Sequence, residues 1–416
     1  MREMKDSGIS WVGEIPKEWT IMPLYCFYSE RKNKNIFGAE NNLLSLSYGK
    51  VIRKDINTSE GLLPSNYNGY NIVEAGDIII RPTDLQNDKR SLRTGLSKER
   101  GIITSAYIAL KPKNGINSRF YHYLLHTYDI LKVFYNMGNG VRQGLNYDEF
   151  AKLMVYSPSD TEQQRIAEFL DRECGKIDGL KADIQAQIDT LEQYKRSVIT
   201  EAVTHGLNPS APMNECSVSW ARQIPQHWKV MPNKHLMTKI KNICPIYKGE
   251  DILSLTMYGV IVRDLDAGGK MPSSFDGYQY IKKGNLLMCL FDIDVTPRCI
   301  GIIKQNGITS PAYSQFKMKK IANARFYYYY YLMVDHTKEL LHLAKNLRHS
   351  LTEDQLGAIK QLVPPLDEQQ EIADYLDNKC AEIEQIIADK KSQIETLDGY
   401  KKSLIYEYVT GKKEVV

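Results

Sequence analysis

The chain has 416 residues, of which 43% are hydrophobic and 25% charged, and its net charge at pH 7 is +4. This composition is typical of a folded protein of about two to three domains and excludes the fibrous and disordered classes. No apolar run reaches the roughly 18 residues of a membrane span, and the first residues have no apolar signal core. The seven cysteines include no C-x-x-C pair. We therefore expect a cytoplasmic protein with reduced thiols, without a disulfide framework or a zinc site.

The sequence repeats itself along the chain. Five pairs of segments match, and the three most informative are SWVGEIPKEWTIMP at 10–23 and SWARQIPQHWKVMP at 219–232, LLSLSYGKVIRKD at 43–55 and ILSLTMYGVIVRD at 252–264, and EQQRIAEFLDREC at 162–174 and EQQEIADYLDNKC at 368–380. The offset between matching segments changes only from 209 to 206 residues. This pattern indicates a tandem duplication and not a short solenoid repeat.

The first part of each copy, about 20–158 and 229–366, contains short β-rich runs separated by Gly, Pro and Asn. Examples are LLSLSYGKVI and GDIII in the first copy, and ILSLTMYGVIV and GNLLMCLF in the second. Each copy also has one aromatic stretch with helical spacing, RFYHYLLH at 119–126 and RFYYYYYL at 325–332. This mixture predicts an α+β domain in each copy. We expect the aromatic stretch to belong to the core, with base stacking as the alternative.

The second part of each copy, about 161–204 and 367–410, has apolar residues at heptad spacing, which is typical of a long helix that pairs with another. The expected seam residues are Leu170, Ile177, Ile184, Leu191 and Val198 with Ile166, Leu180 and Tyr194, and in the second copy Leu376, Ile383, Leu397 and Leu404 with Ile372, Ile386 and Tyr400. Capping boxes are expected at the two starts, Thr161-x-x-Gln164 and Asp367-x-x-Gln370. The alternative is two separate helices, each lying on its own domain.

The charge differs between these parts. Predicted domains and long helices alternate along the chain: domain 1–158, helix 159–206, domain 207–366 and helix 367–416. Residues 20–158 hold 18 Lys and Arg against 12 Asp and Glu, and residues 229–366 hold 19 against 11, which gives net charges of +6 and +8. The two helical parts have net charges of −4 and −5. Two basic domains indicate a nucleic acid as partner, whereas solvated charged faces are enough to explain the acidic helices.

Recognisable catalytic motifs are absent from the sequence. There is no Walker A loop, no G-x-S-x-G, no H-E-x-x-H and no Asn/Asp-Pro-Pro-aromatic methyltransferase motif. His122 and His126 have the i,i+4 spacing of a metal-binding pair, but Tyr328 and Leu332 replace them in the second copy, which favours packing. We therefore expect no catalytic residue, no metal site and no cofactor in this chain.

Candidate DNA contacts are polar residues in loops and at strand ends. Two loops place them before expected capping boxes: Arg142 and Gln143 before Asn146-x-x-Glu149, and Arg348 and His349 before Thr352-x-x-Gln355. Free amides at a helix N-terminus beside an arginine suit a phosphate. The other candidates suit guanine or phosphate contacts: Arg53, Lys54, Arg81, Lys89, Arg90, Arg93, Arg263, Lys270, Arg298 and Lys304. A loop packed on its own domain, or a solvated cation, is the alternative at each position.

The duplicated plan resembles the specificity subunit of type I restriction–modification systems. The resemblance rests on the entry motif W-x-G-x-I-P-x-x-W, seen as WVGEIPKEW at 11–19 and WARQIPQHW at 220–228, and on E-Q-x-x-I-A-x-x-L-D at the start of each long helix. Arg222 departs from the glycine of the entry motif. The match recurs twice and covers essentially the whole chain.

The resemblance implies two tandemly duplicated α+β DNA-recognition domains, separated by two long antiparallel coiled-coil helices. Each domain would read one half of a split, asymmetric double-stranded DNA site. Two methylation subunits and then restriction subunits would dock, and S-adenosylmethionine, ATP and Mg²⁺ would belong to those partners. Two other interpretations remain: a coiled-coil scaffold protein without sequence-specific DNA binding, and the recognition half of a larger single-chain restriction enzyme.

Overall fold

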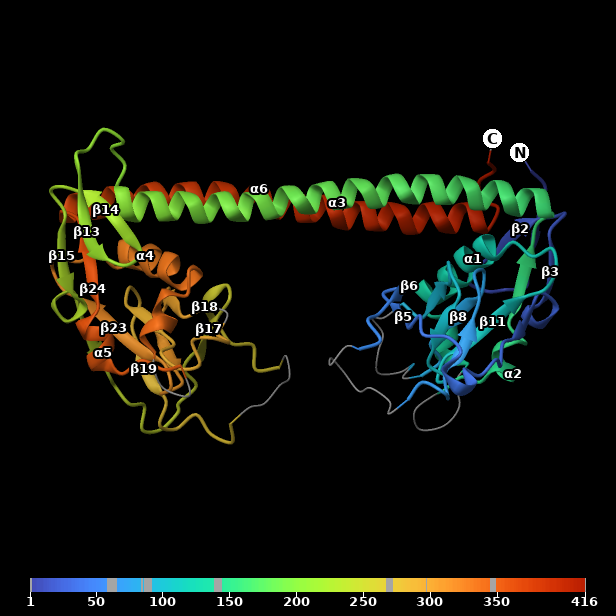
Figure 1. The fold of residues 1–416 in the computed structure, drawn as a ribbon, viewed down its shortest axis with the longest axis horizontal. Helices are drawn as coiled ribbons and strands as arrows, with labels where there is room; N and C mark the ends of the chain where they lie inside the picture. Colours follow the sequence, from blue (N-terminus) through green and yellow to red (C-terminus); the bar gives the residue numbers. More distant parts are fainter. Residues whose placement is uncertain are drawn as a thin grey trace. The chain divides into compact units, whose positions relative to one another are not determined.

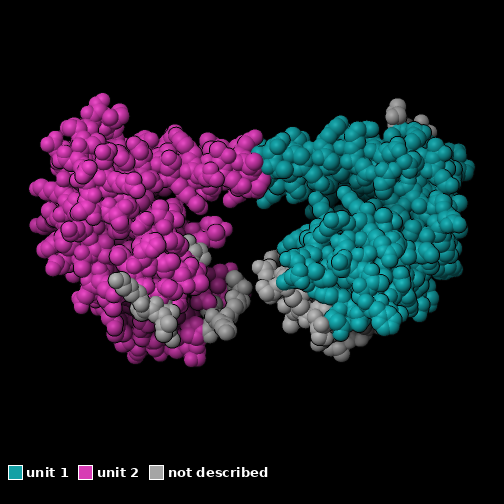
Figure 2. All heavy atoms as spheres, in the orientation of Figure 1, with its two compact units in different colours: residues 1–184, 392–416 teal, residues 185–391 magenta. Residues whose placement is uncertain are grey.

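The computed structural model describes residues 2–57, 66–83, 85, 92–137, 144–266, 272–296, 298–344 and 349–415. It forms two compact units (Figures 1 and 2). Unit 1 consists of Met1–Ile184 and Ser392–Val416, and unit 2 of Gln185–Lys391. Both boundaries fall inside long helices, so each unit combines one α+β part with portions of both long helices. The domain ranges predicted from the sequence, which separate domains from helices, stay a prediction.

Unit 1 contains short strands and few helices before its long helix. The strands are β1 (Met4–Asp6), β2 (Glu14–Pro16), β3 (Thr20–Pro23), β4 (Tyr28–Glu30), β5 (Leu44–Ser47), β6 (Lys50–Arg53), β7 (Asn71–Val73), β8 (Ile78–Ile80), β9 (Thr94–Leu96), β10 (Gly101–Ile103), β11 (Ile108–Pro112) and β12 (Met154–Ser157). The helices are α1 (Ser118–Ile130), α2 (Tyr147–Phe150) and the 3-10 turns η1 (Leu24–Cys26), η2 (Ile36–Gly38) and η3 (Val133–Asn136).

Unit 2 contains the corresponding elements. The strands are β13 (Met213–Val218), β14 (Ala221–Pro225), β15 (Lys229–Pro232), β16 (Met237–Ile240), β17 (Leu253–Thr256), β18 (Gly259–Val262), β19 (Gln279–Ile281), β20 (Leu286–Met288), β21 (Ile300–Ile302), β22 (Gly307–Thr309), β23 (Ser314–Met318) and β24 (Lys360–Val363). The shorter helices are α4 (Ala324–His336), α5 (Glu353–Ala358), η4 (Asn233–His235) and η5 (Glu339–Leu343).

The strands pair in the same order in both units. A four-stranded antiparallel sheet has the order β4-β11-β8-β9 in unit 1 and β16-β23-β20-β21 in unit 2. Two-stranded pairs accompany it, β1-β2, β3-β12, β5-β6 and β7-β10 in unit 1 and β13-β14, β15-β24, β17-β18 and β19-β22 in unit 2. The β-rich runs predicted from the sequence are therefore strands, and the two copies have the same topology.

Each sheet has an aromatic helix on one face and a hairpin on the other. Strand β8 shows this alternation, because Ile78 and Ile80 pack in the same cluster as α1, whereas Ile79 packs with Leu44 of the β5-β6 hairpin. Helix α1 lies between the sheet and the long helices (Figure 1). In unit 2, β20 and the β17-β18 hairpin repeat the arrangement. The aromatic stretches are core, as expected, since for example Phe326, Tyr327 and Tyr330 are buried.

The two long helices are α3 (Asp160–His205) and α6 (Leu366–Val409). In unit 1, Lys181 contacts Asp398, and Lys401 Nζ lies 2.6 Å from Asp178 Oδ1. Higher residue numbers in α3 thus pair with lower ones in α6, so the helices run antiparallel there.

The two long helices also run antiparallel in unit 2. Lys195 contacts Glu384, and Lys390 Nζ donates to Gln187 Oε1 over 2.5 Å. Gln187 lies at the seam position between Leu180 and Tyr194, and Lys390 at the seam position between Ile383 and Leu397, so these two polar residues contact each other across the helix pair. In the described residues, no helix has both the length and the apolar composition needed to cross a bilayer.

One of the two predicted seam rows is confirmed along both helices, and the other is exposed beyond the first turns. In the confirmed row, Ile177, Ile383 and Leu404 are buried, and Ile184, Leu191, Val198 and Leu397 are half-buried. Ile166, Leu170, Ile372 and Leu376 are buried, as expected. Four of the expected seam residues are instead exposed: Leu180, Tyr194, Ile386 and Tyr400. Ile188, Ile199, Ile387 and Ile405 are buried in their place or beside them. The physical reason is that a helix has 3.6 residues per turn, so a strict seven-residue pattern drifts around its surface by about 20° per heptad.

The predicted capping boxes at the helix starts are also wrong. Helix α3 begins at Asp160 and α6 at Leu366, so Thr161 and Asp367 lie inside the first turn. The Ser159 hydroxyl accepts from the Glu162 N–H at 3.4 Å instead. Buried glutamines of the E-Q-Q motifs bind the segment that precedes each long helix. Gln163 Nε2 donates to the Pro158 carbonyl at 3.0 Å, and Gln369 Nε2 donates to the Pro364 carbonyl at 2.9 Å.

The W…P…W entry motif packs where one long helix starts and the other ends. In unit 1, the indole N–H of buried Trp19 donates to Glu162 Oε2 in the first turn of α3 at 3.0 Å. Gly411 follows the end of α6 with φ +70°, and a Cβ there would lie 2.4 Å from Pro16 Cγ. In unit 2, Gly206 follows α3 with φ +78°, and its Cβ would lie 3.3 Å from Trp228 Cζ2. The motif thus joins both long helices to each domain.

We expect Gly411→Ala to destabilise unit 1. The substitution places a Cβ against Pro16 and requires a left-handed backbone, which together cost at least about 1–3 kcal/mol. Thermal unfolding should show a lower midpoint. Gly399→Ala is the matched control, since Gly399 lies in α6 with no atom within 4 Å of an added Cβ. The control should be neutral or stabilising. Equal midpoints for Gly411→Ala and the unchanged chain would contradict the close packing at this junction.

Candidate nucleic-acid interface

The β5-β6 hairpin carries two of the predicted DNA contacts. Its turn residues Tyr48 and Gly49 have φ values of +44° and +78°, the combination typical of a tight two-residue hairpin turn. Its inner face packs on the sheet across Gly95, where a Cβ would lie 2.5 Å from Leu46 Cδ1 and 3.1 Å from Val51 Cγ2. The hairpin therefore lies directly on strand β9, and its outer face points away from the sheet.

The β17-β18 hairpin of unit 2 packs on its sheet in the same way. Gly301 of β21 replaces Gly95, because a Cβ there would lie 2.7 Å from Val260 Cγ2 and 2.8 Å from Leu255 Cδ1. The close approach of hairpin and sheet requires glycine at this position in both units. Lys54 and Arg263 directly follow the two hairpins, and their N–H groups donate to the carbonyls of Leu43 and Ile252 at 2.8 and 2.7 Å. The structure thus gives Lys54 and Arg263 equivalent positions.

Arg53 is exposed but already has an acidic partner. Its guanidinium contacts the carboxylate of Glu99, with Nε 2.8 Å from Oε1. Glu99 also accepts from Asn42 Nδ2 at 3.1 Å. The Arg53 partner lowers the pKa of Glu99, so the pair stays ionised near neutral pH. This ion pair ties the end of β6 to the loop before β10. Lys54, one residue further on, is exposed.

Arg93 requires a correction, because the sequence interpretation placed it among surface cations. The structure buries it completely. Its Nε donates to the Tyr135 hydroxyl at 3.2 Å, its Nη1 donates to the Thr83 carbonyl, and its guanidinium lies 5.2 Å from the centroid of the Tyr135 ring. A side chain held this way serves the fold and does not reach DNA. Arg81, whose N–H donates to the Arg93 carbonyl at 2.8 Å, is half-buried.

Arg298 is half-buried and positions the second hairpin. Its Nη1 donates to the Met257 carbonyl in the hairpin turn at 2.9 Å, and its Nη2 to the Tyr328 hydroxyl at 2.9 Å. Its guanidinium lies 5.7 Å from the Tyr328 ring centroid. In unit 1, Leu92 occupies the corresponding place, 3.1 Å from an added Cβ on Gly49. Arg298 in unit 2 and Leu92 in unit 1 therefore contact the hairpin turn from equivalent positions, although the two side chains differ.

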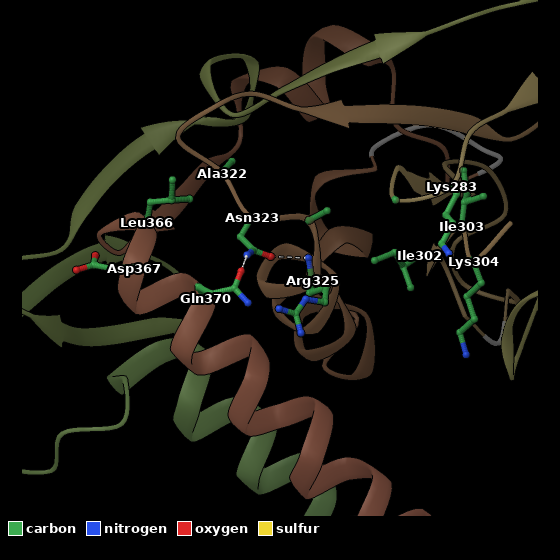
Figure 3. A pocket seen from close by; sticks show the side chains of 12 residues that line it. Lys283, Ile302, Ile303, Lys304, Ala322, Asn323, Arg325, Leu366, Asp367 and Gln370 are labelled. Carbon is green, nitrogen blue, oxygen red and sulfur yellow. Dashed lines mark hydrogen bonds between the residues drawn. The ribbon is translucent and has the colours of Figure 1, made fainter. Parts of the chain in front are cut away.

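Lys304 is exposed and lies beside the pocket of Figure 3, which has a volume of about 1030 Å³. One wall joins α4 to α6: Asn323 accepts from the Arg325 N–H at 2.9 Å and donates to Gln370 Oε1 at 2.6 Å. Lys283 and Lys304 lie on the other side of the pocket in Figure 3. The amides at the start of α4 are thus satisfied by the Asn323 side chain, which leaves them unavailable to an anion.

The two expected capping boxes beside the predicted phosphate sites are confirmed. Asn146 caps α2 and Thr352 caps α5, each with reciprocal side-chain and backbone bonds. His349 has φ +44°, and its Nε2 lies 4.0 Å from Asp294 Oδ2. Six predicted contacts lie outside the described residues: Lys89, Arg90, Arg142, Gln143, Lys270 and Arg348.

Sequence reasoning missed exposed apolar residues on the two hairpins. The main ones are Tyr48, Ile52, Met257, Tyr258 and Ile261. A signal was present, since Val51 and Ile52 are adjacent in one strand, as are Val260 and Ile261, and adjacent strand residues face opposite sides. One residue of each pair had to point outward.

The histidine pair of α1 packs inside unit 1. Burial lowers the pKa of His122 to about 3 and of His126 to about 4, and the positive charges of Lys401 and Lys402 contribute at His126. The ring centroids of the two histidines lie 6.0 Å apart. Within the described part of the chain, no group of three or more His, Cys, Asp or Glu side chains is arranged to hold a metal ion. Packing is therefore the better interpretation of the pair.

We expect His126→Leu, which installs the residue of the second copy, to reduce the acid sensitivity of unit 1. The unfolded state binds a proton at His126 below about pH 6.5, whereas the folded state binds it only near pH 4. The free energy of unfolding therefore falls as the pH drops through this window, by at most about 1.4 kcal/mol per pH unit for this group.

Urea unfolding at pH 7 and pH 5 provides the measurement. The buried carboxyl of Asp129, whose pKa is raised to about 6 by burial, acts in the opposite direction but is present in both proteins. The difference between the two proteins thus isolates His126. The same loss of stability on acidification in both proteins would contradict the prediction.

Two basic α+β parts, each with a supported hairpin and each tied to long antiparallel helices, form the candidate nucleic-acid interface. The sequence model of the type I restriction modification DNA specificity domain matches residues 30–190 and 299–396. The chain belongs to this family, and the resemblance seen in the sequence is confirmed.

Known relatives align with nearly the full length of this chain. A curated type I restriction enzyme MjaX specificity subunit of Methanocaldococcus jannaschii is 22% identical over 97% of this chain and 96% of its own. A chain from a solved type I R-M system has a TM-score of 0.68 at 12% identity, with 96% of this chain and 99% of that chain covered. The HsdS subunit of Thermoanaerobacter tengcongensis has a TM-score of 0.45 at 11% identity, over 96% and 98%. The TM-score of 0.68 supports the fold assignment.

Proposed function

We propose that this chain reads a bipartite, asymmetric DNA site and directs the methylation and restriction subunits of a type I restriction–modification complex to it. The observation that carries the proposal is the repetition of one strand order in both units, together with a family match in each copy of the repeat. Each unit would read one half-site. The halves would differ because equivalent positions hold different residues, such as Lys50 and Gly259.

Positive charge supports binding to the DNA backbone. The parts 20–158 and 229–366 carry net charges of +6 and +8, and phosphate contacts supply much of the affinity of such proteins. Among the predicted contacts, we retain those that the structure leaves exposed or half-buried, and those outside the described residues: Arg53, Lys54, Arg81, Arg263, Lys304 and His349, and Lys89, Arg90, Arg142, Gln143, Lys270 and Arg348. Arg298 is retained only as a residue that positions the hairpin.

The long helices would act as an antiparallel coiled coil that sets the spacer between the half-sites. In each unit α3 and α6 already make cross-helix contacts in the antiparallel sense. Each helix is also clamped to its domain. Asp171 of α3 accepts from Arg119 at 2.8 Å and from Tyr123 at 2.9 Å. Asp377 of α6 accepts equivalently from Arg325 and Tyr329. A domain fixed to a helix in this way allows helix length to control half-site spacing.

The exposed apolar residues of the long helices would be docking points for two methylation subunits. Lys181 pairs with Asp398 in unit 1, so Leu180 and Tyr400 lie at about the same level of the helix pair. Unit 2 presents the equivalent residues, Ile386 and Tyr194, from opposite helices. An aliphatic and a tyrosine side chain are thus exposed in each unit. Two equivalent patches suit two copies of one partner.

The chain would have no catalytic role of its own. This proposal rests on the absence of a catalytic motif from the sequence and on the family's description as a DNA specificity domain. S-adenosylmethionine, ATP and Mg²⁺ would be bound by the methylation and restriction subunits. The present chain would determine which DNA sequence the complex recognises.

Purified components test the proposal. The chain, its methylation subunit and S-adenosylmethionine should transfer methyl groups to DNA that contains the target site. The chain alone should transfer none. Methyl transfer by the chain alone would contradict the non-catalytic role. A complex that assembles but binds all DNA sequences equally would favour the coiled-coil scaffold instead.

A further inference from the structure

The outer faces of the two hairpins share one pattern of side chains. Cross-strand pairs put Ser45 opposite Ile52 and Ser47 opposite Lys50 in unit 1. These residues alternate with Leu46 and Val51, which pack on the sheet, so they lie on the face that points away from it.

The hairpin of unit 2 repeats this face. Ser254 lies opposite Ile261, and Thr256 opposite Gly259, while Leu255 and Val260 pack inward. Lys54 lies two residues after Ile52, and Arg263 two residues after Ile261. By strand alternation, each therefore lies on the same outer face as its isoleucine. Both hairpins thus have two hydroxyl residues, one isoleucine and one cation at equivalent positions, and unit 1 adds Lys50 where unit 2 has Gly259.

The fold does not require isoleucine at the outward positions of the two hairpins. Ile52 and Ile261 keep 42% and 43% of their surface accessible, because each follows a strand residue that packs inward. In the described residues, the hydroxyls of Ser45 and Ser254 make no hydrogen bond. The Thr256 hydroxyl, in contrast, donates to the Gly259 carbonyl at 3.0 Å within the turn. One unused hydroxyl opposite an exposed isoleucine, at equivalent positions of two units, indicates a surface that is completed by a ligand.

The turns add exposed aromatic rings. Tyr48 is 85% exposed and Tyr258 is 77% exposed. Tyr48 also has φ +44°, a conformation in which glycine or asparagine is favoured and a bulky side chain costs free energy. Because the ring is exposed, no packing in unit 1 compensates for this cost.

We propose that the outer faces of the β5-β6 and β17-β18 hairpins enter the major groove of double-stranded DNA and read bases there. A two-stranded ribbon fits the major groove, serine and threonine hydroxyls bond base edges, and aliphatic carbons contact the thymine methyl group. Lys50 and Lys54 provide the positive charge that this partner requires; Lys50 is 73% exposed, and its Nζ lies 3.9 Å from Asp178 of α3. The inference rests on the proposed function and names the residues that determine specificity.

The rigid support of each hairpin matches this role. Gly95 and Gly301 let the hairpins lie directly on the sheets, and Arg298 holds the Met257 carbonyl at one turn. Base reading depends on side chains that are fixed relative to the groove. A hairpin that merely closed the fold would need neither an exposed isoleucine nor a supported turn.

The test uses the complex of the full chain with its methylation subunit. The unit 1 variant is Ser45→Ala with Ile52→Ala, and the unit 2 variant is Ser254→Ala with Ile261→Ala. Met154→Ala in β12 and Ile321→Ala before α4 are the controls, since both are exposed apolar residues outside the hairpins. Each complex methylates a DNA library in which every base of the site is randomised in turn.

Each hairpin variant should lose about tenfold in discrimination at one or two base positions, all in one half-site. The two variants should affect different halves, and the controls should match the unchanged chain. Unchanged base preference in both hairpin variants would overturn the proposal, as would loss of the methylation subunit from the purified complex, which would make the face a protein contact. If the unchanged complex shows no sequence preference, the proposed function itself fails.

Discussion

A chain in which residues 229–363 are replaced by residues 20–157 is expected to direct methylation to a site with two copies of one half-site. The graft exchanges everything from β15 to β24 for everything from β3 to β12, so each terminal strand pair is transferred whole. The half-site read by unit 1 should appear twice, and the half-site read by unit 2 should disappear.

The contacts between domain and helix make this graft feasible. Asn117 donates to Gln164 at 2.6 Å in unit 1, and Asn323 to Gln370 at 2.6 Å in unit 2. The aspartate clamps on Arg119 and Arg325 also correspond. The grafted domain therefore finds on α6 the partners that it has on α3. Methylome sequencing of a host that expresses the graft with its methylation subunit provides the measurement. Retention of the second half-site would mean that 229–363 does not read it.

Insertion of four residues into each long helix at the unit boundary is expected to lengthen the non-specific spacer by one or two base pairs. The insertions follow Ile184 in α3 and Lys391 in α6. Every cross-helix contact named above lies within one unit, so the insertions leave each of them intact. Four residues add about 6 Å of helix, which corresponds to roughly two base pairs at about 3.4 Å each.

Helix register separates this result from a general disruption. Four residues are close to one turn of a paired helix, so the seam continues with a local stutter. A two-residue insertion at the same places rotates the following seam by about 200° and should abolish most methylation. Both variants should keep the same half-sites wherever they remain active. An unchanged spacer in the four-residue variant would mean that the helices do not set the spacing.

Local sequence patterns were enough to predict several features of the fold. The long helices begin and end within one residue of the heptad ranges 161–204 and 367–410, because heptad spacing, the absence of proline and a proline before each start all agree. The capping boxes at Asn146 and Thr352 were predictable for the same reason, since a box involves only four consecutive residues. The second row of the seam, with Leu180, Tyr194, Ile386 and Tyr400, was not, because burial there depends on the partner helix and on the twist between the two.

The candidate site was less predictable, since it depends on contacts between distant segments. Arg93 looked like a surface cation, but the Tyr135 hydroxyl and the Thr83 carbonyl solvate it in the interior. The repeat contained a hint, because Cys299 holds the corresponding place in unit 2 and is also buried. Their N–H groups both donate to an aspartate, Asp129 and Asp335. Comparing the two copies position by position would have removed Arg93 from the candidates.

The most direct test of the central claim is the methylome of a host that lacks other DNA methylation and expresses this chain with its methylation subunit. If each unit reads one half-site, the methylome should contain one motif made of two different specific half-sites. A spacer of fixed length, in which every base is tolerated, should separate them. Methylation at a single contiguous motif would contradict the claim. So would the absence of new methylation in cells where the complex is assembled.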